Sequence, residues 1–193
     1  MRNGIYINLT NRCTNHCTFC IRNEGAGVYG SDSLWLDREP TAKEVLDDLG
    51  KYDFSKYNEV VFCGYGEPTI RIEELCEVAR GIKAMCSLPI RINTNGQGNL
   101  IHGRDITPMF EGIVDIVSIS MNTADAESYA EVCKPAYGEA AYRAVLDFGL
   151  CASKHVPEVI FSVVRTTIPD EDIEKCRVLA EKYGGKLRVR ELD

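Results

Sequence analysis

Short apolar segments alternate with amphipathic helical patterns along all 193 residues of the chain. The apolar segments are expected strands, and they lie at 5–9, 59–63, 89–93, 115–120, 159–164 and 187–192. Such alternation is typical of a parallel sheet whose strands are joined by helices. A complete eight-stranded barrel of this kind takes about 250 residues. We therefore expect one α/β domain over residues 1–193, folded as an open (β/α)6 partial TIM barrel, with a flavodoxin-like doubly wound sheet as the alternative.

Helix signals fill the segments between these strands. Thr41 and Glu44 have the spacing of a capping box, in which each side chain bonds the backbone of the other residue. Asp170 is the expected N-cap of a helix that Gly184 and Gly185 end. Apolar residues at helical spacing predict further helices at about 75–85, 105–111, 125–132 and 139–154.

The net charge of −7 narrows the classes of function. An acidic chain lacks the basic surface that general nucleic-acid binding or a polybasic membrane patch needs. No run reaches the ~18 apolar residues that suggest a membrane span. The first residues, MRNGIYINLT, lack the apolar core of a signal peptide. The expected compartment is therefore the cytoplasm.

Nine cysteines are present, and three of them, Cys13, Cys17 and Cys20, lie together just after the first expected strand. An odd total in a reducing compartment argues against a disulfide framework. The six dispersed cysteines are interpreted as packing residues, because buried cysteine behaves as a small hydrophobe.

Thiolates suit zinc or an iron–sulfur cluster, but structural zinc and ferredoxin-type clusters each take four ligands. Three thiolates on a four-iron cluster would leave one iron open to a substrate or cofactor. A zinc site completed by His16, or a plain electron-transfer cluster, stays as the alternative.

Polar turns follow three of the other expected strands. The segment GYGEP at 64–68 ends one strand, and NTNG at 93–96 ends the next. Ser118, Ser120 and Asn122 alternate with apolar residues, which predicts that they share the inner face of the barrel. The carboxyl ends of parallel strands meet at one rim, where ligands bind. A tight turn into a helix would also explain Glu67.

Arginines are concentrated on or beside the expected strands, at Arg91, Arg165, Arg188 and Arg190. An arginine inside a barrel is costly unless it is paired. Its partner is expected to be either a carboxylate of the barrel interior or an anionic ligand.

The segment CTNHCTFC at 13–20 resembles the CxxxCx-aromatic-C motif of the radical S-adenosylmethionine (SAM) superfamily. The resemblance implies a [4Fe–4S] cluster on Cys13, Cys17 and Cys20, with SAM chelating the open iron. It also implies reductive cleavage of SAM to methionine and a 5′-deoxyadenosyl radical, which abstracts hydrogen from a substrate. By the same resemblance, the residues that contact SAM are Phe19, beside the adenine, together with Gly64, Tyr65, Gly66, Glu67, Asn93, Thr94, Asn95, Ser120, Asn122 and Arg165.

Over nearly its whole length, the chain resembles the TatD-associated (TatD-linked) radical SAM proteins. The segments that carry this resemblance are Leu34-Trp-Leu, Glu39-Pro-Thr, VFCGYGEPT at 61–69, NTNGQG at 93–98 and Arg188-Val-Arg. That name reflects gene association with a TatD-type metallohydrolase and implies no settled reaction.

Two kinds of partner are implied. The reaction needs a one-electron donor of the flavodoxin or ferredoxin class. An open barrel must also be covered, because an exposed radical would be quenched by side reactions. The glycine-rich loop at 23–33 offers little bulk beyond Tyr29, Leu34 and Trp35. A protein or another bulky substrate is therefore expected to close the barrel, and the arginines favour an anionic group on it.

Overall fold

The computed structural model describes residues 3–24 and 33–191. Its strands are β1 (Gly4–Ile7), β2 (Glu59–Phe62), β3 (Ile90–Thr94), β4 (Ile116–Ser120), β5 (Glu158–Val164) and β6 (Lys186–Arg190). Its α-helices are α1 (Ala42–Leu49), α2 (Ile72–Met85), α3 (Gly98–His102), α4 (Ala126–Cys133), α5 (Ala140–Ala152) and α6 (Asp170–Lys182). Short 3-10 helices lie at Ile21–Glu24, Phe54–Lys56, Pro68–Arg71, Thr107–Phe110 and Arg165–Thr167.

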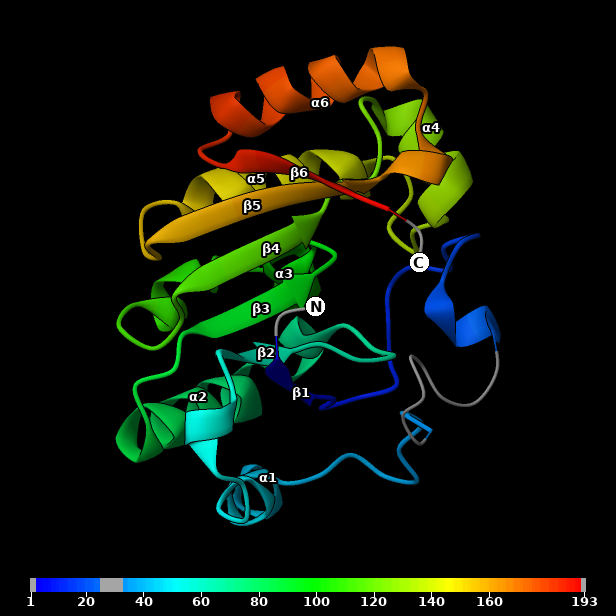
Figure 1. Cartoon of the computed structure of the whole chain (residues 1–193). Helices are drawn as coiled ribbons and strands as arrows, with labels where there is room; N and C mark the ends of the chain where they lie inside the picture. Colours follow the sequence, from blue (N-terminus) through cyan, green and yellow to red (C-terminus); the bar gives the residue numbers. More distant parts are fainter. Residues whose placement is uncertain (1–2, 25–32, 192–193) are drawn as a thin grey trace.

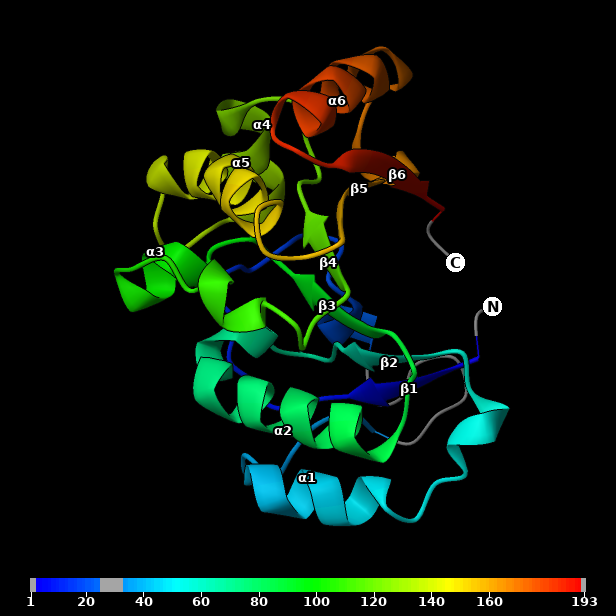
Figure 2. The same ribbon diagram turned by 90° about the vertical axis from the view of Figure 1, so that its left-hand side faces the viewer.

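The six strands form one parallel sheet in the order β1-β2-β3-β4-β5-β6. Figures 1 and 2 show the sheet curving, with the helices on its outer side. Among the described residues β1 and β6 pair with one neighbour each and not with one another, so the sheet is an open partial barrel. The doubly wound alternative is wrong, because a doubly wound sheet reverses its strand order at a switch point.

The two faces of the sheet differ in chemistry, as the alternation in β4 predicts. Ile119 and Met121 are fully buried in the apolar core beneath the helices. Polar side chains meet on the other face, where Ser120 lies opposite Ser162, and Ser162 lies opposite Arg188. The barrel interior is therefore polar and the layer between sheet and helices is apolar.

The capping box that precedes α1 is confirmed. The Thr41 hydroxyl accepts from the Glu44 amide at 3.2 Å, and the Glu44 carboxylate accepts from the Thr41 amide at 2.9 Å. The expected cap of α6 is wrong by one residue. Pro169 is the N-cap and makes no side-chain cap bond, because Asp170 is already helical and its carboxylate accepts from Arg165 at 2.9 Å.

Two other helices differ from expectation. The segment Gly98–His102 forms α3 although no amphipathic pattern predicts it, since five residues are too few to show one. The helix expected at 105–111 is a single 3-10 turn, Thr107–Phe110. The described helices include none that is long and apolar enough to cross a membrane.

Candidate cluster and cofactor site

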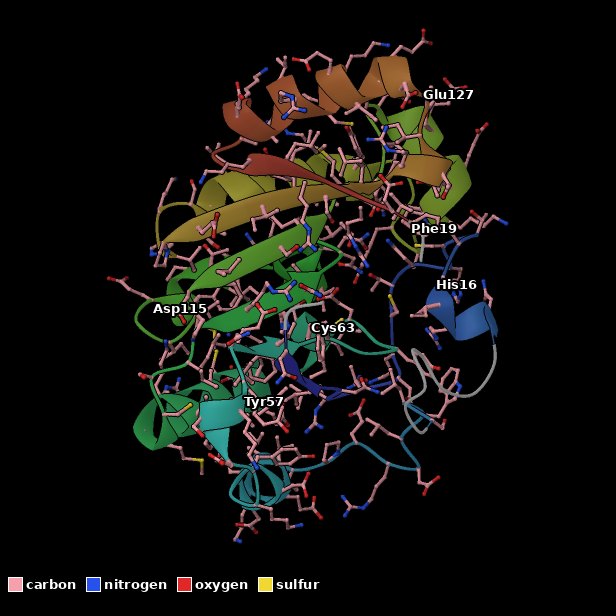
Figure 3. The ribbon with its side chains drawn as sticks, in the orientation of Figure 1. His16, Phe19, Tyr57, Cys63, Asp115 and Glu127 are labelled. Atoms are coloured by element: carbon pink, nitrogen blue, oxygen red, sulfur yellow. The ribbon has the colours of Figure 1, made fainter. Side chains whose placement is uncertain are left out.

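The loop after β1 carries the three clustered cysteines and lies over the carboxyl ends of the strands (Figure 3). The segment that ends α4 holds it in place: the His16 amide donates to the Cys133 carbonyl at 3.0 Å, and the Thr18 amide donates to the Val132 carbonyl at 2.9 Å. Figure 3 shows His16 and Phe19 on this loop, Cys63 deeper in the barrel, and Asp115 at the opposite, amino ends of the strands.

The environments of the first two thiols differ. The Cys13 sulfur accepts from the Asn15 amide at 3.4 Å and from the Asn95 side chain at 3.9 Å. Burial, reinforced by the charge of Glu67, raises the pKa of the Cys13 thiol to about 11. A hydrogen bond to Cys133, together with burial, raises the pKa of Cys17. Binding of iron would overcome these shifts, because a coordinating thiol is deprotonated outright.

A cavity of about 240 Å³ is lined by Cys17 and Cys20, and its other walls include His16, Arg22 and Trp35. Within the described residues, no three Cys, His, Asp or Glu side chains converge in a way that could hold a metal ion. Three cysteine thiols on one loop, two of which line the cavity, form a donor set that is chemically suited to an iron–sulfur cluster.

Glu67 closes the turn that follows β2. Its buried carboxylate, 3% exposed, accepts from the Thr69 amide at 3.0 Å and hydroxyl at 2.6 Å. It also accepts from the Thr94 hydroxyl at 2.7 Å and the Asn95 amide at 2.6 Å. Burial raises the pKa of Glu67 in opposition to these donors. Glu67 is the N-cap of the 3-10 helix Pro68–Arg71, as the alternative of a turn into a helix predicts. Its carboxylate also joins the end of β2 to the end of β3.

Gly66 lies against the backbone of the cysteine loop. A Cβ atom at this position would come within 2.2 Å of the Thr10 carbonyl oxygen and 2.7 Å of the Arg12 carbonyl oxygen. Because both contacts are with backbone, no side chain can rotate to make room. The glycine is therefore needed for the close approach of the two segments.

We expect Gly66→Ala to lower the free energy of unfolding by roughly 1–3 kcal/mol, the usual cost of forcing extra volume into a packed site. Urea denaturation followed by circular dichroism measures the free energy of unfolding of the native and variant chains. Gly50→Ala is the matched control, because its Cβ would meet nothing closer than 3.6 Å. Equal stability of the two variants would contradict the close approach.

A buried polar network beneath the cysteine loop escaped the sequence interpretation. The Gln97 side chain, fully buried, donates to Asn15 at 2.7 Å and to the Tyr129 hydroxyl at 3.1 Å, and accepts from Thr14 at 2.8 Å. Asn95 donates to Thr14 at 2.8 Å. The network joins the cysteine loop to the end of β3 and to α4. The sequence hints at this network only through the position of Gln97, which directly follows the NTNG segment at 93–96.

The remaining predicted contacts are placed as follows. The rings of Tyr65 and Trp35 lie 4.9 Å apart between centroids, and Tyr65 is buried. Ser120 ends β4 on the inner face. Asn122 has a φ of 62° and donates to the Cys133 sulfur at 3.3 Å.

Arg165 pairs with Glu191 and Asp170, each at 2.9 Å. The contacts of Tyr65, Ser120, Asn122 and Arg165 with SAM stay predictions.

The inner-face arginines divide into two groups. Arg91 forms a buried, bidentate ion pair with Glu59 at 2.9 and 3.1 Å, and it donates to the Asn93 side chain at 2.9 Å. The interior-carboxylate interpretation is therefore confirmed for Arg91. Arg188 and Arg190 are exposed on the edge strand β6.

The interpretation of the dispersed cysteines as packing holds for Cys76 and Cys176, which are fully buried in the core. It is incomplete for Cys63, which follows β2 beside Asn93, and for Cys133, which contacts Cys17. Of the glycine-rich loop at 23–33, residues 25–32, including Tyr29, lie outside the described residues.

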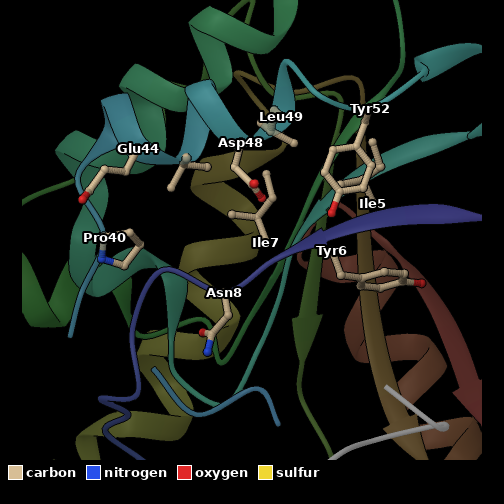
Figure 4. Close-up of a pocket in the computed structure, with 10 residues that line it drawn as sticks. Ile5, Tyr6, Ile7, Asn8, Pro40, Glu44, Asp48, Leu49 and Tyr52 are labelled. Atoms are coloured by element: carbon tan, nitrogen blue, oxygen red, sulfur yellow. The ribbon is translucent and has the colours of Figure 1, made fainter. Parts of the chain in front are cut away.

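Another cavity of about 240 Å³ lies between β1 and α1, and Pro40, Asp48 and Tyr52 are among its walls (Figure 4). It runs along the edge strand and none of the clustered cysteines lines it. We therefore place the candidate site at the cysteine loop.

A family profile described as "Radical SAM superfamily" matches residues 7–180. The chain belongs to the radical SAM superfamily. Members of this superfamily are enzymes whose cofactors are a [4Fe–4S] cluster and SAM, so the family assignment supports both cofactors for this chain. The non-enzymatic alternative is correspondingly disfavoured.

Known radical SAM proteins agree with this assignment. GTP 3′,8-cyclase of Corynebacterium glutamicum is 29% identical over 194 residues, covering 96% of this chain and 48% of the relative. The Lactiplantibacillus plantarum GTP 3′,8-cyclase is 26% identical over 131 residues, covering 67% and 36%. The chain thus spans less than half the length of these curated relatives.

Solved structures show the same fold. Streptococcus suis SuiB, in a crystal structure bound to the precursor peptide SuiA, superposes with a TM-score of 0.71 at 14% identity, covering 100% of this chain and 40% of SuiB. A radical SAM methyltransferase from Sphaerobacter thermophilus superposes with a TM-score of 0.67 at 15% identity, covering 98% and 55%.

Proposed function

We propose that this radical SAM protein binds its [4Fe–4S] cluster through Cys13, Cys17 and Cys20 and cleaves SAM reductively to act on a bulky, anionic substrate. One observation carries the proposal: the loop that bears the three cysteines lies across the carboxyl ends of the strands, and Cys17 and Cys20 line a cavity of about 240 Å³. When bound, the cluster delivers one electron to SAM and yields the 5′-deoxyadenosyl radical.

The protein's own residues hold and shield the reactants. The turn of Gly64, Tyr65 and Gly66 is proposed to present backbone groups to the methionine end of SAM. Glu67 is proposed to act through this turn, because its carboxylate is buried and already accepts four hydrogen bonds. Phe19 is proposed to pack beside the adenine. The other proposed contacts are Asn93, Thr94, Asn95, Ser120, Asn122 and Arg165.

The inner face of the barrel supports a bulky, anionic substrate. The edge strands β1 and β6 leave the sheet open, and Tyr6 on β1 is 56% exposed. Arg188 and Arg190 are exposed on β6 and supply positive charge at the opposite edge. A substrate with an anionic group could therefore enter between the edges and be held there by charge-assisted hydrogen bonds.

The finer assignment is to the TatD-associated radical SAM proteins, supported by the segments at 61–69 and 93–98. A reductant of the flavodoxin or ferredoxin class is proposed as the electron source. We propose the cytoplasm as the compartment, because a reducing environment keeps the thiols of Cys13, Cys17 and Cys20 available for iron.

Electron paramagnetic resonance tests the proposed site before any substrate is known. Because a cluster held by Cys13, Cys17 and Cys20 alone would keep one iron without a protein ligand, we expect SAM to shift the spectrum of the reduced cluster in the native protein. Gly64→Ala, whose Cβ would come within 2.3 Å of the Asn8 side chain, should weaken this effect while the iron content stays unchanged. A spectrum that saturating SAM leaves unaltered would exclude an open iron.

A further inference from the structure

Cys17 meets a second cysteine that belongs to a distant part of the sequence. The loop around it runs antiparallel to the end of α4, with an isolated bridge between Asn15 and Pro135. The backbone hydrogen bonds of His16 and Thr18 to this segment fix the alignment of the two chains. This alignment brings Cys17 beside Cys133, and the two thiols interact.

The partner thiol is firmly placed. Cys133 is the last residue of α4 and is fully buried, and its sulfur accepts from the Asn122 side chain at 3.3 Å. Cys17 is only half-buried and lines the cavity of about 240 Å³. A small oxidant in that cavity can therefore reach the Cys17 thiol. The Cys133 thiol is buried next to Cys17 and does not line the cavity. Both residues are free thiols.

We propose that Cys17 and Cys133 form a reversible disulfide when the cluster is absent and the chain meets a peroxide. This inference rests on the proposed function only in taking Cys17 as a cluster ligand. Peroxide oxidises Cys17 to the sulfenic acid and leaves as water, and the Cys133 thiol then attacks that sulfur. The S–S bond forms, a second water is released, and the peroxide O–O bond has taken up the two electrons.

The disulfide would have two consequences. It removes one of the three cluster ligands, so the oxidised chain cannot bind the cluster until a dithiol reduces it. It also stops Cys17 at a reversible stage, since a sulfenic acid without a neighbouring thiol proceeds to the irreversible sulfinic acid. Cys133 therefore protects a cluster ligand.

Peptide mapping tests the disulfide directly. The full-length, cluster-free protein is treated with hydrogen peroxide, alkylated, digested without reductant and analysed by mass spectrometry. We expect a cross-linked pair of peptides whose fragments assign the bond to Cys17 and Cys133, lost on dithiothreitol treatment. The cross-link should be absent from Cys133→Val and retained by Cys176→Val, a control that removes another fully buried cysteine. A bond among Cys13, Cys17 and Cys20, or alkylated Cys133 in the peroxide-treated protein, overturns the proposal.

Iron uptake supplies the second measurement and does not depend on activity. After peroxide treatment, the native chain should lose most of its iron-binding capacity in reconstitution, and dithiothreitol should restore it. The Cys133→Val chain should lose the capacity in a way that dithiothreitol does not restore. Restoration to the same extent in both chains would overturn the protective role. A protein that fails to cleave SAM could still form the cross-link and take up iron. The disulfide proposal and the proposed function can therefore fail separately.

Discussion

Replacement of Cys13, Cys17 or Cys20 by alanine, one at a time, is expected to abolish the brown absorbance of the reconstituted protein. Native protein should hold about four iron and four sulfide per chain, as a single cubane cluster requires. Each thiolate is expected to bind a different iron. A variant with only two of the three thiolates is therefore expected to lose the cluster. Iron and sulfide analysis after anaerobic reconstitution measures the loss.

Two matched variants test the choice of ligands. Cys63 lies beside Asn93 on the inner face, and Cys133 contacts Cys17, so both thiols are near the site without belonging to the motif. Cys63→Ala and Cys133→Ala should keep the cluster. The ligand assignment is wrong if either of these variants loses the cluster while all three motif variants keep it.

Arg91→Met is expected to lower the free energy of unfolding by about 3–5 kcal/mol, the cost of leaving a buried charge without its partner. Arg91 and Glu59 are both less than a tenth exposed, and two hydrogen bonds of 2.9 and 3.1 Å join them. Denaturation of the native and variant chains by urea gives the difference.

Two further variants make this stability test specific. The double variant Glu59→Gln with Arg91→Met should recover most of the loss, because no unpaired charge is then buried. Arg104→Met removes an arginine from the pair with Glu73, whose side chains are 54% and 72% exposed. Exposed ion pairs contribute about 0–1 kcal/mol, so Arg104→Met should lower the free energy of unfolding only slightly. Equal losses in Arg91→Met and Arg104→Met would show that burial does not make the pair important.

The parts of the fold that the sequence predicts are those governed by local pattern. The continuous apolar run at 60–63 marks a strand covered on both faces, and β2 is buried along its whole length. The spacing of Thr41 and Glu44 predicts the start of α1 because both bonds of a capping box are local. The alternation around Ser118 likewise predicts which face of β4 meets the core.

The parts that could not be predicted depend on residues far apart in the chain. Gln97 and Tyr129 become neighbours of Asn15 only once β3, α4 and the cysteine loop have packed together. The contact of Cys17 with Cys133 likewise bridges more than a hundred residues. Asp170 has the chemistry of an N-cap, but the preceding proline already sets the helix entry and Arg165 engages its carboxylate.

Anaerobic turnover with SAM and dithionite tests the central claim most directly. The quantity measured is 5′-deoxyadenosine released per reconstituted chain, with the Cys17→Ala chain as control. We expect slow release from the native protein without substrate and none from the variant, and a true substrate should accelerate the release. A native chain that carries a complete cluster, binds SAM and yet releases no 5′-deoxyadenosine would contradict radical SAM catalysis by this protein.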